Sequence, residues 1–313
     1  GCPLEAPDPD RRHAWVPARL LREPCEAAEE GTPGWVPYSL AFPRWQDTRA
    51  EEPRTHPPFF AGIGAGTDVA EASADAWAQL RAQDALWAWW SDPRAPSPFP
   101  LLPSAQIAAL CEGGGPFRLE LGHIPAPLGG RAVLARAEAE GLSALGAACG
   151  SEEAAQRAAV AGALWQLVVA RALDDPGDAL HRSGVAGLSP HRADRAYLAA
   201  AGPRRRRLLD PLGHVQLLLD PILQAEIARR FAQRAEPAAA AEPAASRAPL
   251  GGVWRVRLSP AGSAGGTVCV RLLVPAARTP PLGAFPAEPS AGRAGEERAA
   301  RPEGPEGLPY PGW

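Results

Sequence analysis

The feature that most constrains this chain of 313 residues is a glycine-rich segment followed by a long stretch free of proline and glycine. Residues 62–66 read GIGAG, and the uninterrupted stretch runs over residues 69–90. Glycine allows positive φ and a close approach of the backbone to a ligand, while Thr67 or Asp68 can cap a helix that follows. The pattern therefore predicts a glycine-rich turn that leads into one long helix.

One face of this expected helix is mostly apolar. Trp77, Leu80 and Trp87 recur at helical spacing, with Asp84 between the last two. We expect the three apolar side chains to lie in the core. A carboxylate on such a face needs a partner.

Composition limits what the rest of the chain can be. With 46% hydrophobic and 21% charged residues, the chain can form one or two closely joined globular domains, which excludes disorder throughout. A formal net charge of −3 gives no bulk attraction to nucleic acid or anionic lipid, and no apolar run is long enough to span a bilayer. Residues 1–12 lack the apolar core of a signal peptide, and the five cysteines contain no C-x-x-C pair, so we expect reduced thiols in a cytoplasm. Because the chain begins with Gly1 rather than methionine, we expect it to be a fragment or a processed form.

Further segments predict a mixed helix and strand protein. Residues 104–111, 152–173 and 221–231 have helical patterns, and the second of these carries Leu164, Leu167, Val168 and Arg171 on one stripe that should pack on a sheet. Residues 117–124 and 142–148 read as strands, and residues 253–258 and 267–274 should pair as antiparallel neighbours. Two proline-containing runs, residues 15–21 and 35–42, suit edge strands or extended segments.

Read without a gap, residues 62–90 resemble the signature of the YcaO family. That signature is a turn of the form G-x-A-A-G that leads through E-A into a helix written L-L-E-x-x-E-R-D-A, followed by tryptophans. The matching residues are Gly62, Ala65, Gly66, Glu71, Ala72, Asp84, Ala85, Trp89 and Trp90. The resemblance implies an α/β fold of largely antiparallel sheets covered by long helices. It also implies ATP-dependent O-phosphorylation of a backbone amide in a ribosomal peptide, which allows an azoline ring to close.

The residues that the family uses for Mg and ATP are replaced in this chain. In the family, two helix glutamates three residues apart help to hold Mg and the phosphates, and the matching positions here are Gln79 and Ala82, followed by Gln83 in place of an arginine. The family's second helix ends A-L-T-E-x-x-Q-x-R. Here its Glu and Gln positions are Gln166 and Val169, while Ala163, Leu164 and Arg171 match. A neutral amide cannot offset the charge of Mg, so the resemblance implies a conserved frame that has lost its metal ligands.

Two later segments also resemble the family. A strand end of the form V-x-R-x-x-V-P-G is matched by Arg271, Val274 and Pro275, and Arg271 is either a nucleotide contact or an ordinary strand-end arginine. Members that act on peptides often end in a P-x-P-x-P tail that reaches back to the active site, which Pro309 and Pro311 match and Trp313 departs from. The positions that would contact a cofactor are therefore Gly62, Gly64, Gly66, Gln79, Gln166 and Arg271, with no metal ligand and no catalytic residue identified.

These observations leave three hypotheses open. The first is a degenerate subunit without cofactor that binds a precursor peptide or a catalytic partner, with a homodimer as one option. The second is an active cyclodehydratase that uses ATP and Mg through Glu71, Asp84 or Asp68. The third is a structural protein unrelated to the family. We expect a helix and sheet region over residues 1–234, an Ala/Pro/Glu-rich linker over 235–249, a β-hairpin over 250–275 that completes the domain, and a Pro/Gly-rich tail over 276–313.

Overall fold

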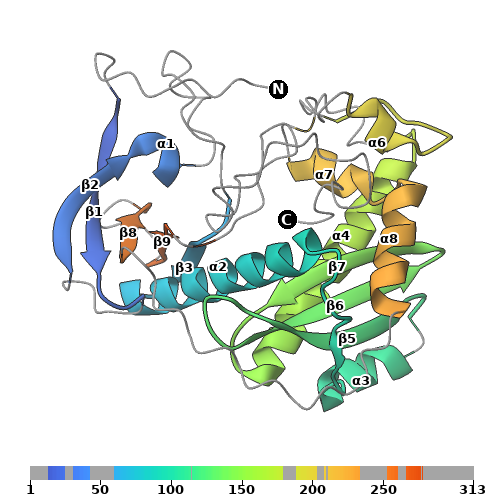
Figure 1. Ribbon diagram of the computed structural model, residues 1–313, viewed down its shortest axis with the longest axis horizontal. Helices are drawn as coiled ribbons and strands as arrows, with labels where there is room; N and C mark the ends of the chain where they lie inside the picture. The colour runs from blue at the N-terminus through green and yellow to red at the C-terminus, as the bar shows by residue number, and fades with distance from the viewer. Residues whose placement is uncertain are drawn as a thin grey trace.

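The computed structural model contains two antiparallel sheets, which one long helix connects (Figure 1). It describes residues 13–24, 31–42, 60–113, 115–178, 188–202, 208, 211–232, 252–259, 266–275 and 277. The predicted linker over residues 235–249, and Pro309 and Pro311 in the predicted tail, lie outside the described residues. Within the described part of the chain, no helix combines the length and the apolar character that crossing a membrane requires.

The first sheet, sheet A, has the strand order β2-β1-β8-β9-β3. Its strands are β1 (Trp15–Leu21), β2 (Thr32–Pro37), β3 (Ile63–Gly66), β8 (Val253–Arg257) and β9 (Val268–Leu273). The predicted antiparallel pair of β8 and β9 is confirmed. The prediction that β1 is an edge strand is wrong, because β1 lies between β2 and β8. Pro17 is tolerated there because β8 pairs only with Arg19, Leu20 and Leu21, which leaves the other edge of β1 open at Pro17.

The second sheet, sheet B, has the order β4-β5-β6-β7. Its strands are β4 (Phe99–Pro100), β5 (Arg118–Pro125), β6 (Arg131–Ala139) and β7 (Leu142–Ala148). Every strand pair in both sheets is antiparallel, so the predicted class of helices on largely antiparallel sheets is confirmed. Strand β6 was not predicted, although it lies at the centre of the sheet.

The described helices are α1 (Tyr38–Ala41), α2 (Val69–Ser91), α3 (Ala105–Glu112), α4 (Glu152–Asp174), α6 (Tyr197–Ala200), α7 (Pro211–Leu217) and α8 (Pro221–Ala232). Helix α2 begins where the sequence predicts, because the side chain of Asp68 accepts a hydrogen bond of 2.8 Å from Glu71 N. Helix α1 corrects a prediction, because residues 35–42 were expected to form an edge strand or an extended segment and residues 38–41 are helical.

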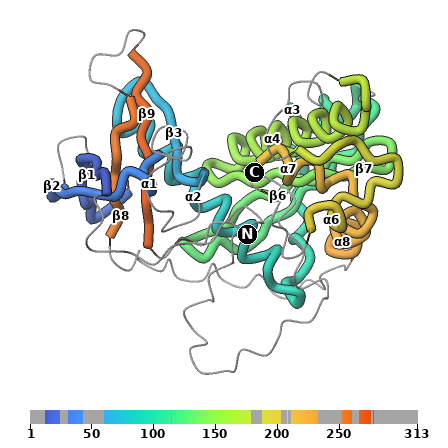
Figure 2. Tube along the Cα trace, turned by 90° about the horizontal axis from the view of Figure 1, so that it is seen from above, coloured from blue at the N-terminus to red at the C-terminus, as the bar shows by residue number. Residues whose placement is uncertain are grey.

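Helix α2 runs between the two sheets in the view from above (Figure 2), and it contributes residues to a hydrophobic core at each of them. Ala72, Ala76 and Leu80 in its N-terminal half pack with Val270 and Leu272 of sheet A. The core around sheet B includes five residues of its C-terminal half: Ala82, Ala85, Leu86, Trp89 and Trp90. The length of one helix therefore joins the two sheets.

Residues 63–66 of the turn that was predicted over residues 62–66 form strand β3, which pairs with β9. Its glycines are explained by packing. A Cβ at Gly64 would lie 2.2 Å from Ala76 N, inside the backbone of α2. Only Gly62 has the positive φ that the prediction invoked, at 78°. Gly64 therefore allows β3 to pack closely against α2, the helix that follows it.

Two predictions of burial need correction. Leu80 is buried as expected, but Trp77 and Trp87 are only half-buried, and the buried tryptophans of α2 are Trp89 and Trp90. On α4, Val168 is 65% exposed. Small residues at Ala159, Ala163 and Ala170 contact the sheet in its place, because only small side chains fit under a closely packed helix.

Candidate functional site

The outer edge of β3 is closed by side chains from α2. Because β9 pairs with the inner side of β3, the amide groups of residues 63, 65 and 67 point outward. Ile63 N donates to Gln79 Oε1 at 2.9 Å, Ala65 N donates to Asp75 Oδ2 at 3.0 Å and Thr67 N donates to Glu71 Oε2 at 2.7 Å. The three acceptors are spaced four residues apart, so they lie on one stripe of the helix.

This arrangement uses two of the candidate ligands. Gln79 is exposed, but its amide oxygen already accepts a hydrogen bond from the backbone. Glu71 also accepts from Thr67 Oγ1 at 2.7 Å, and the hydrogen bond from the Thr67 backbone holds the pKa of Glu71 below its usual value. These side chains complete a sheet edge that would otherwise be open to other strands.

The middle of α2 is enclosed. Ala82 is 3% exposed and belongs to the core around sheet B, and Asp84 is 1% exposed. Arg81 Nη2 donates to the carbonyl oxygen of Gly129 in the β5–β6 turn. Burial raises the pKa of the nearby Cys149 thiol to about 11, which keeps it neutral. Ala82, where a second metal-binding carboxylate is expected from the resemblance, is a core residue.

Gln166 lies on α4, apart from the α2–β3 group. It is 2% exposed. Helix α4 packs on the face of sheet B that carries Ala135 and Gly146, since a Cβ at Gly146 would lie 2.1 Å from Ala159 O. The C-terminal end of α2 lies on the opposite face, where Trp89 contacts Phe231 and Phe231 contacts Arg136.

Arg271 is buried in sheet A on the face away from α2. It pairs with Ile63, whereas Gly64 and Val270 face the helix. Its Nη1 donates to Ala41 O at 3.1 Å, and burial lowers its pKa to about 10. The structure thus brings Gly62, Gly64, Gly66 and Gln79 together, but it places Arg271 and Gln166 elsewhere.

These residues do not fit a site for Mg and ATP. Gln79 is occupied by Ile63 N, while Ala82 and Val169 offer no oxygen ligand. Of the alternative ligands, Asp68 caps α2 by accepting from Glu71 N, while Glu71 and Asp84 are thirteen helical positions apart, which is about 20 Å along the axis. Among the described residues, no three His, Cys, Asp or Glu side chains are grouped as metal ligands would be.

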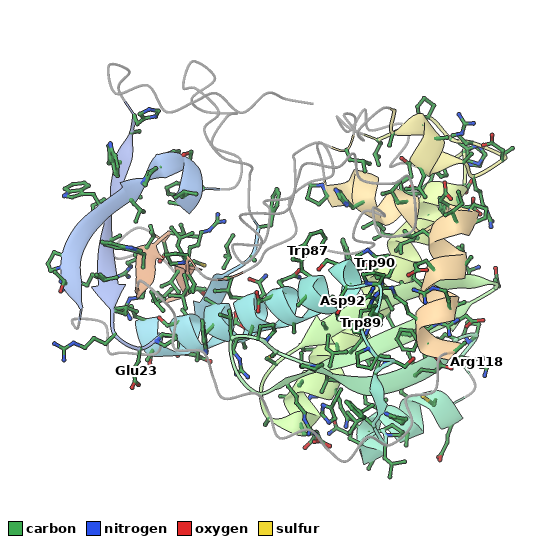
Figure 3. All side chains as sticks on the ribbon, in the orientation of Figure 1. Glu23, Trp87, Trp89, Trp90, Asp92 and Arg118 are labelled. Atoms are coloured by element: carbon green, nitrogen blue, oxygen red, sulfur yellow. The ribbon has the colours of Figure 1, made fainter. Side chains whose placement is uncertain are left out.

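Sequence reasoning missed a buried charged cluster that lies where α2 meets α8, beside Trp89 and Trp90, which Figure 3 labels. Arg230 Nε donates to Glu226 Oε1 at 2.7 Å, and Arg230 Nη1 donates to Trp89 O at 2.7 Å. The guanidinium lies 5.2 Å from the ring of Trp89 and 4.7 Å from that of Trp90. Only the i, i+4 spacing of Glu226 and Arg230 could have indicated it.

Comparison with known proteins gives structural similarities alone. No protein-family model matches the chain, and no curated protein matches it. The heterocyclase TruD is similar over 87% of this chain, with 16% identity and a TM-score of 0.47. YcaO from Methanopyrus kandleri, solved with AMPPCP and Mg2+, is similar over 84% with 19% identity and a TM-score of 0.47. The E. coli microcin synthetase McbBCD complex is similar over 83% with 9% identity and a TM-score of 0.44. The chain spans 35% of the TruD structure and 64% of each of the other two.

Proposed function

We propose that this chain is a YcaO-like protein of azoline peptide biosynthesis that binds a precursor peptide or a catalytic partner and does not itself use ATP. The proposal depends on what the side chains of Gln79 and Ala82, the two motif positions on α2, contact in the structure. Gln79 closes the edge of β3, and Ala82 is packed in the core. A site that once held two carboxylates for Mg would leave this pattern after it had been lost.

The competing proposal is an active cyclodehydratase with other ligands. Phosphoryl transfer needs several oxygen ligands around one metal ion to neutralise the developing charge. Glu71 is already hydrogen-bonded to Thr67, and about 20 Å separates it from Asp84. The geometry therefore favours the binding role.

The proposal extends to the organisation of the chain. Strands β8 and β9 lie between β1 and β3, which supports a single unit formed by residues 1–234 and 250–275. Residues 235–249 would then be an insertion, and residues 276–313 a tail. Three cysteines in the described chain, Cys111, Cys149 and Cys269, are free thiols, in keeping with the proposed cytoplasmic location.

Restoring the motif tests the proposal. The double variant Gln79→Glu, Ala82→Glu should gain a rise in Tm with Mg and ATP that the parent lacks, because binding to the folded state stabilises it. Ala82→Glu buries a carboxylate and should cost several kcal/mol of stability, so the single variant Gln79→Glu, at an exposed position, is measured beside it as a control for folding. A parent chain whose Tm already rises with Mg and ATP, and not with either alone, would contradict the proposal. So would a folded double variant that shows no gain.

A further inference from the structure

Helix α4 is apolar on the face that points away from sheet B as well as on the face that packs against it. Its outward apolar residues recur every three or four positions, so they lie on one line along the helix. Trp165 is 53% exposed and Val168 is 65% exposed, whereas a surface helix normally carries charged and polar groups on this face. We call this line the outer stripe, and its residues are Ala154, Ala158, Ala161, Trp165, Val168 and Ala172.

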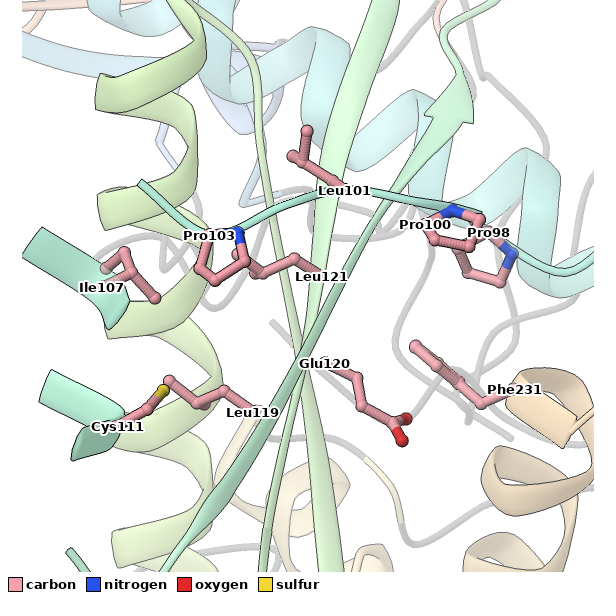
Figure 4. A pocket seen from close by; sticks show the side chains of 10 residues that line it. All are labelled: Pro98, Pro100, Leu101, Pro103, Ile107, Cys111, Leu119, Glu120, Leu121 and Phe231. Atoms are coloured by element: carbon pink, nitrogen blue, oxygen red, sulfur yellow. The ribbon is translucent and has the colours of Figure 1, made fainter. Parts of the chain in front are cut away.

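Helix α3 lies beside α4 and leaves the outer stripe open. Arg157 Nη1 donates to Gln106 Oε1 at 3.2 Å, which joins the flanks of the two helices. Ile107 and Cys111 of α3 line a cavity of about 300 Å³ together with Leu119 of β5, so α3 covers the sheet next to α4 (Figure 4). Of the six residues of the stripe, five are exposed and only the last, at the C-terminal end, is half-buried.

The spacing of the outer stripe is the same in both directions. Its successive steps are four, three, four, three and four residues. Two copies of α4 can therefore lie antiparallel with Ala161 of each copy opposite Trp165 of the other, and with Ala158 opposite Val168. A small side chain then faces a large one on both sides of a twofold axis, which is the complementarity that an interface between identical surfaces requires.

The charged groups beside the stripe favour the antiparallel orientation. Glu153 lies on one flank near the N-terminal end, and Arg171 lies on the same flank near the C-terminal end. Arg157 Nη1 binds Glu153 at 2.9 Å, and Arg171 Nη2 binds Glu140 at 2.8 Å. Antiparallel packing brings Arg171 of one copy beside Glu153 of the other, so two acidic and two basic groups meet at each end. Parallel packing would instead place like charges together and align the two helix dipoles.

The other acidic groups at the ends of α4 make contacts within their own chain. Glu152 Oε2 lies 3.8 Å from His123 Nε2, and Asp174 Oδ1 accepts from Arg195 Nε at 3.0 Å. Both contacts are on the sheet side of the helix. Asp175 follows the last turn, and antiparallel packing places it beside the N-terminal end of the other helix, where a negative charge is stabilising.

We propose that two copies of this chain associate through the outer stripes of their α4 helices, which pack antiparallel about a twofold axis. Helix α4 has 23 residues and is about 34 Å long. Stable interfaces bury about 1,200–2,000 Å², and one helix from each copy lies at the low end of this range, so we expect a dimer that dissociates on dilution. The inference goes beyond the proposed function and does not depend on whether the chain binds ATP.

Sedimentation equilibrium of the full chain over a wide range of concentrations tests the association. We expect the parent to show a monomer–dimer equilibrium. Trp165→Glu and Val168→Glu each place a charge in the stripe and should give a monomer at concentrations where the parent is a dimer. The matched control is Trp15→Glu, because Trp15 is 54% exposed but lies on β1 of sheet A, and this variant should keep the parent's equilibrium. Circular dichroism checks that each variant is folded.

Charge reversals test the antiparallel orientation. Glu153→Arg and Arg171→Glu should each weaken the dimer about tenfold, because each brings like charges together at both ends of the interface. The double variant with both reversals should recover most of the parent's affinity. The two residues are eighteen helical positions apart, about 27 Å along the axis, so this recovery requires pairing between copies.

A parent chain that sediments as a monomer at every concentration would overturn the proposal. A dimer that survives both Trp165→Glu and Val168→Glu would place the interface elsewhere and overturn it too. Failure of the double charge variant to recover affinity would contradict the antiparallel packing. None of these results bears on binding of Mg and ATP, which tests the proposed function separately.

Discussion

Among single residues, Arg230 stands out as a charged side chain that is buried between α2 and α8. It donates to Glu226 and to the backbone of Trp89, a residue 141 positions away. Burial lowers the pKa of Arg230. Burial alone would raise the pKa of Glu226, but the hydrogen bonds and charges of Arg229 and Arg230 together outweigh it and lower that pKa. Removing either partner would leave the other charge buried and unpaired, which is the costly case for buried ion pairs.

Glu226 should make stability depend on acid pH. Its pKa is lower in the folded state than the unfolded value of 4.5, so its contribution is present above that pH and is lost as the pH falls through the folded value. We expect Glu226→Gln to destabilise the protein at neutral pH and to flatten the acid side of the stability profile. Urea unfolding at a series of pH values measures both effects. A variant that keeps the acid slope of the parent would show that other carboxylates cause it.

At the scale of secondary-structure elements, two helices pack on strands at glycine. Gly64 of β3 faces α2, and Gly146 of β7 faces α4. Both sheets also have an edge strand covered by side chains from a helix. On β3 these are Glu71, Asp75 and Gln79, and on β7 Gln224 bonds to the backbone N–H and C=O of Ser143. Such covering keeps exposed edges from pairing with other chains.

Alanine substitutions of glycine separate close packing from chain flexibility. Gly146→Ala should be strongly destabilising, by roughly 2–4 kcal/mol, because its Cβ would meet Ala159 O at 2.1 Å. Gly162 lies on α4, which packs against β7. A Cβ added there would meet only the Cα of Gly146, at 3.8 Å, so Gly162→Ala should stabilise α4 by about 0.5–1 kcal/mol. Thermal unfolding distinguishes the two. If Gly146→Ala were neutral, the close approach of α4 to β7 would be wrong.

The elements that could be predicted are those with strong local signals. Helix α2 has an Asp68 cap and no internal glycine or proline, and β8 and β9 are rich in β-branched residues. Strand β6, RAVLARAEA, reads as helix by propensity and is a strand because it pairs on both sides. The sequence of strand β3 resembles a turn because it contains two glycines. These glycines are required by the close packing of β3 on α2, which the local sequence does not reveal.

At the scale of the whole molecule, α2 is the element that unites the fold. Its N-terminal half completes the core of sheet A, and its C-terminal half lies in the core of sheet B. The motif positions Gln79 and Ala82 lie near the middle of α2, between the half that packs on sheet A and the half that packs on sheet B. Sequence could identify these positions as altered, but it could not show that Gln79 covers a sheet edge, because that contact depends on tertiary structure.

Tryptophan substitutions in α2 test this division. Trp89 is 4% exposed and contacts Phe231 and Arg230, so Trp89→Ala should cost roughly 3–5 kcal/mol of stability. Trp87 is half-buried, and Trp87→Ala should cost less, about 1–2 kcal/mol. Denaturant unfolding followed by circular dichroism compares them. An equal or larger cost at Trp87 would mean that the helix is rotated relative to the structure described.

The proposed function requires that the chain does not bind ATP through the two motif positions on α2. Isothermal titration of the full chain with ATP in the presence of Mg tests it most directly. Because Gln79 is occupied by Ile63 N and Ala82 lies in the core, we expect no heat beyond that of dilution. Saturable binding in the micromolar range that disappears when Mg is removed would contradict the claim.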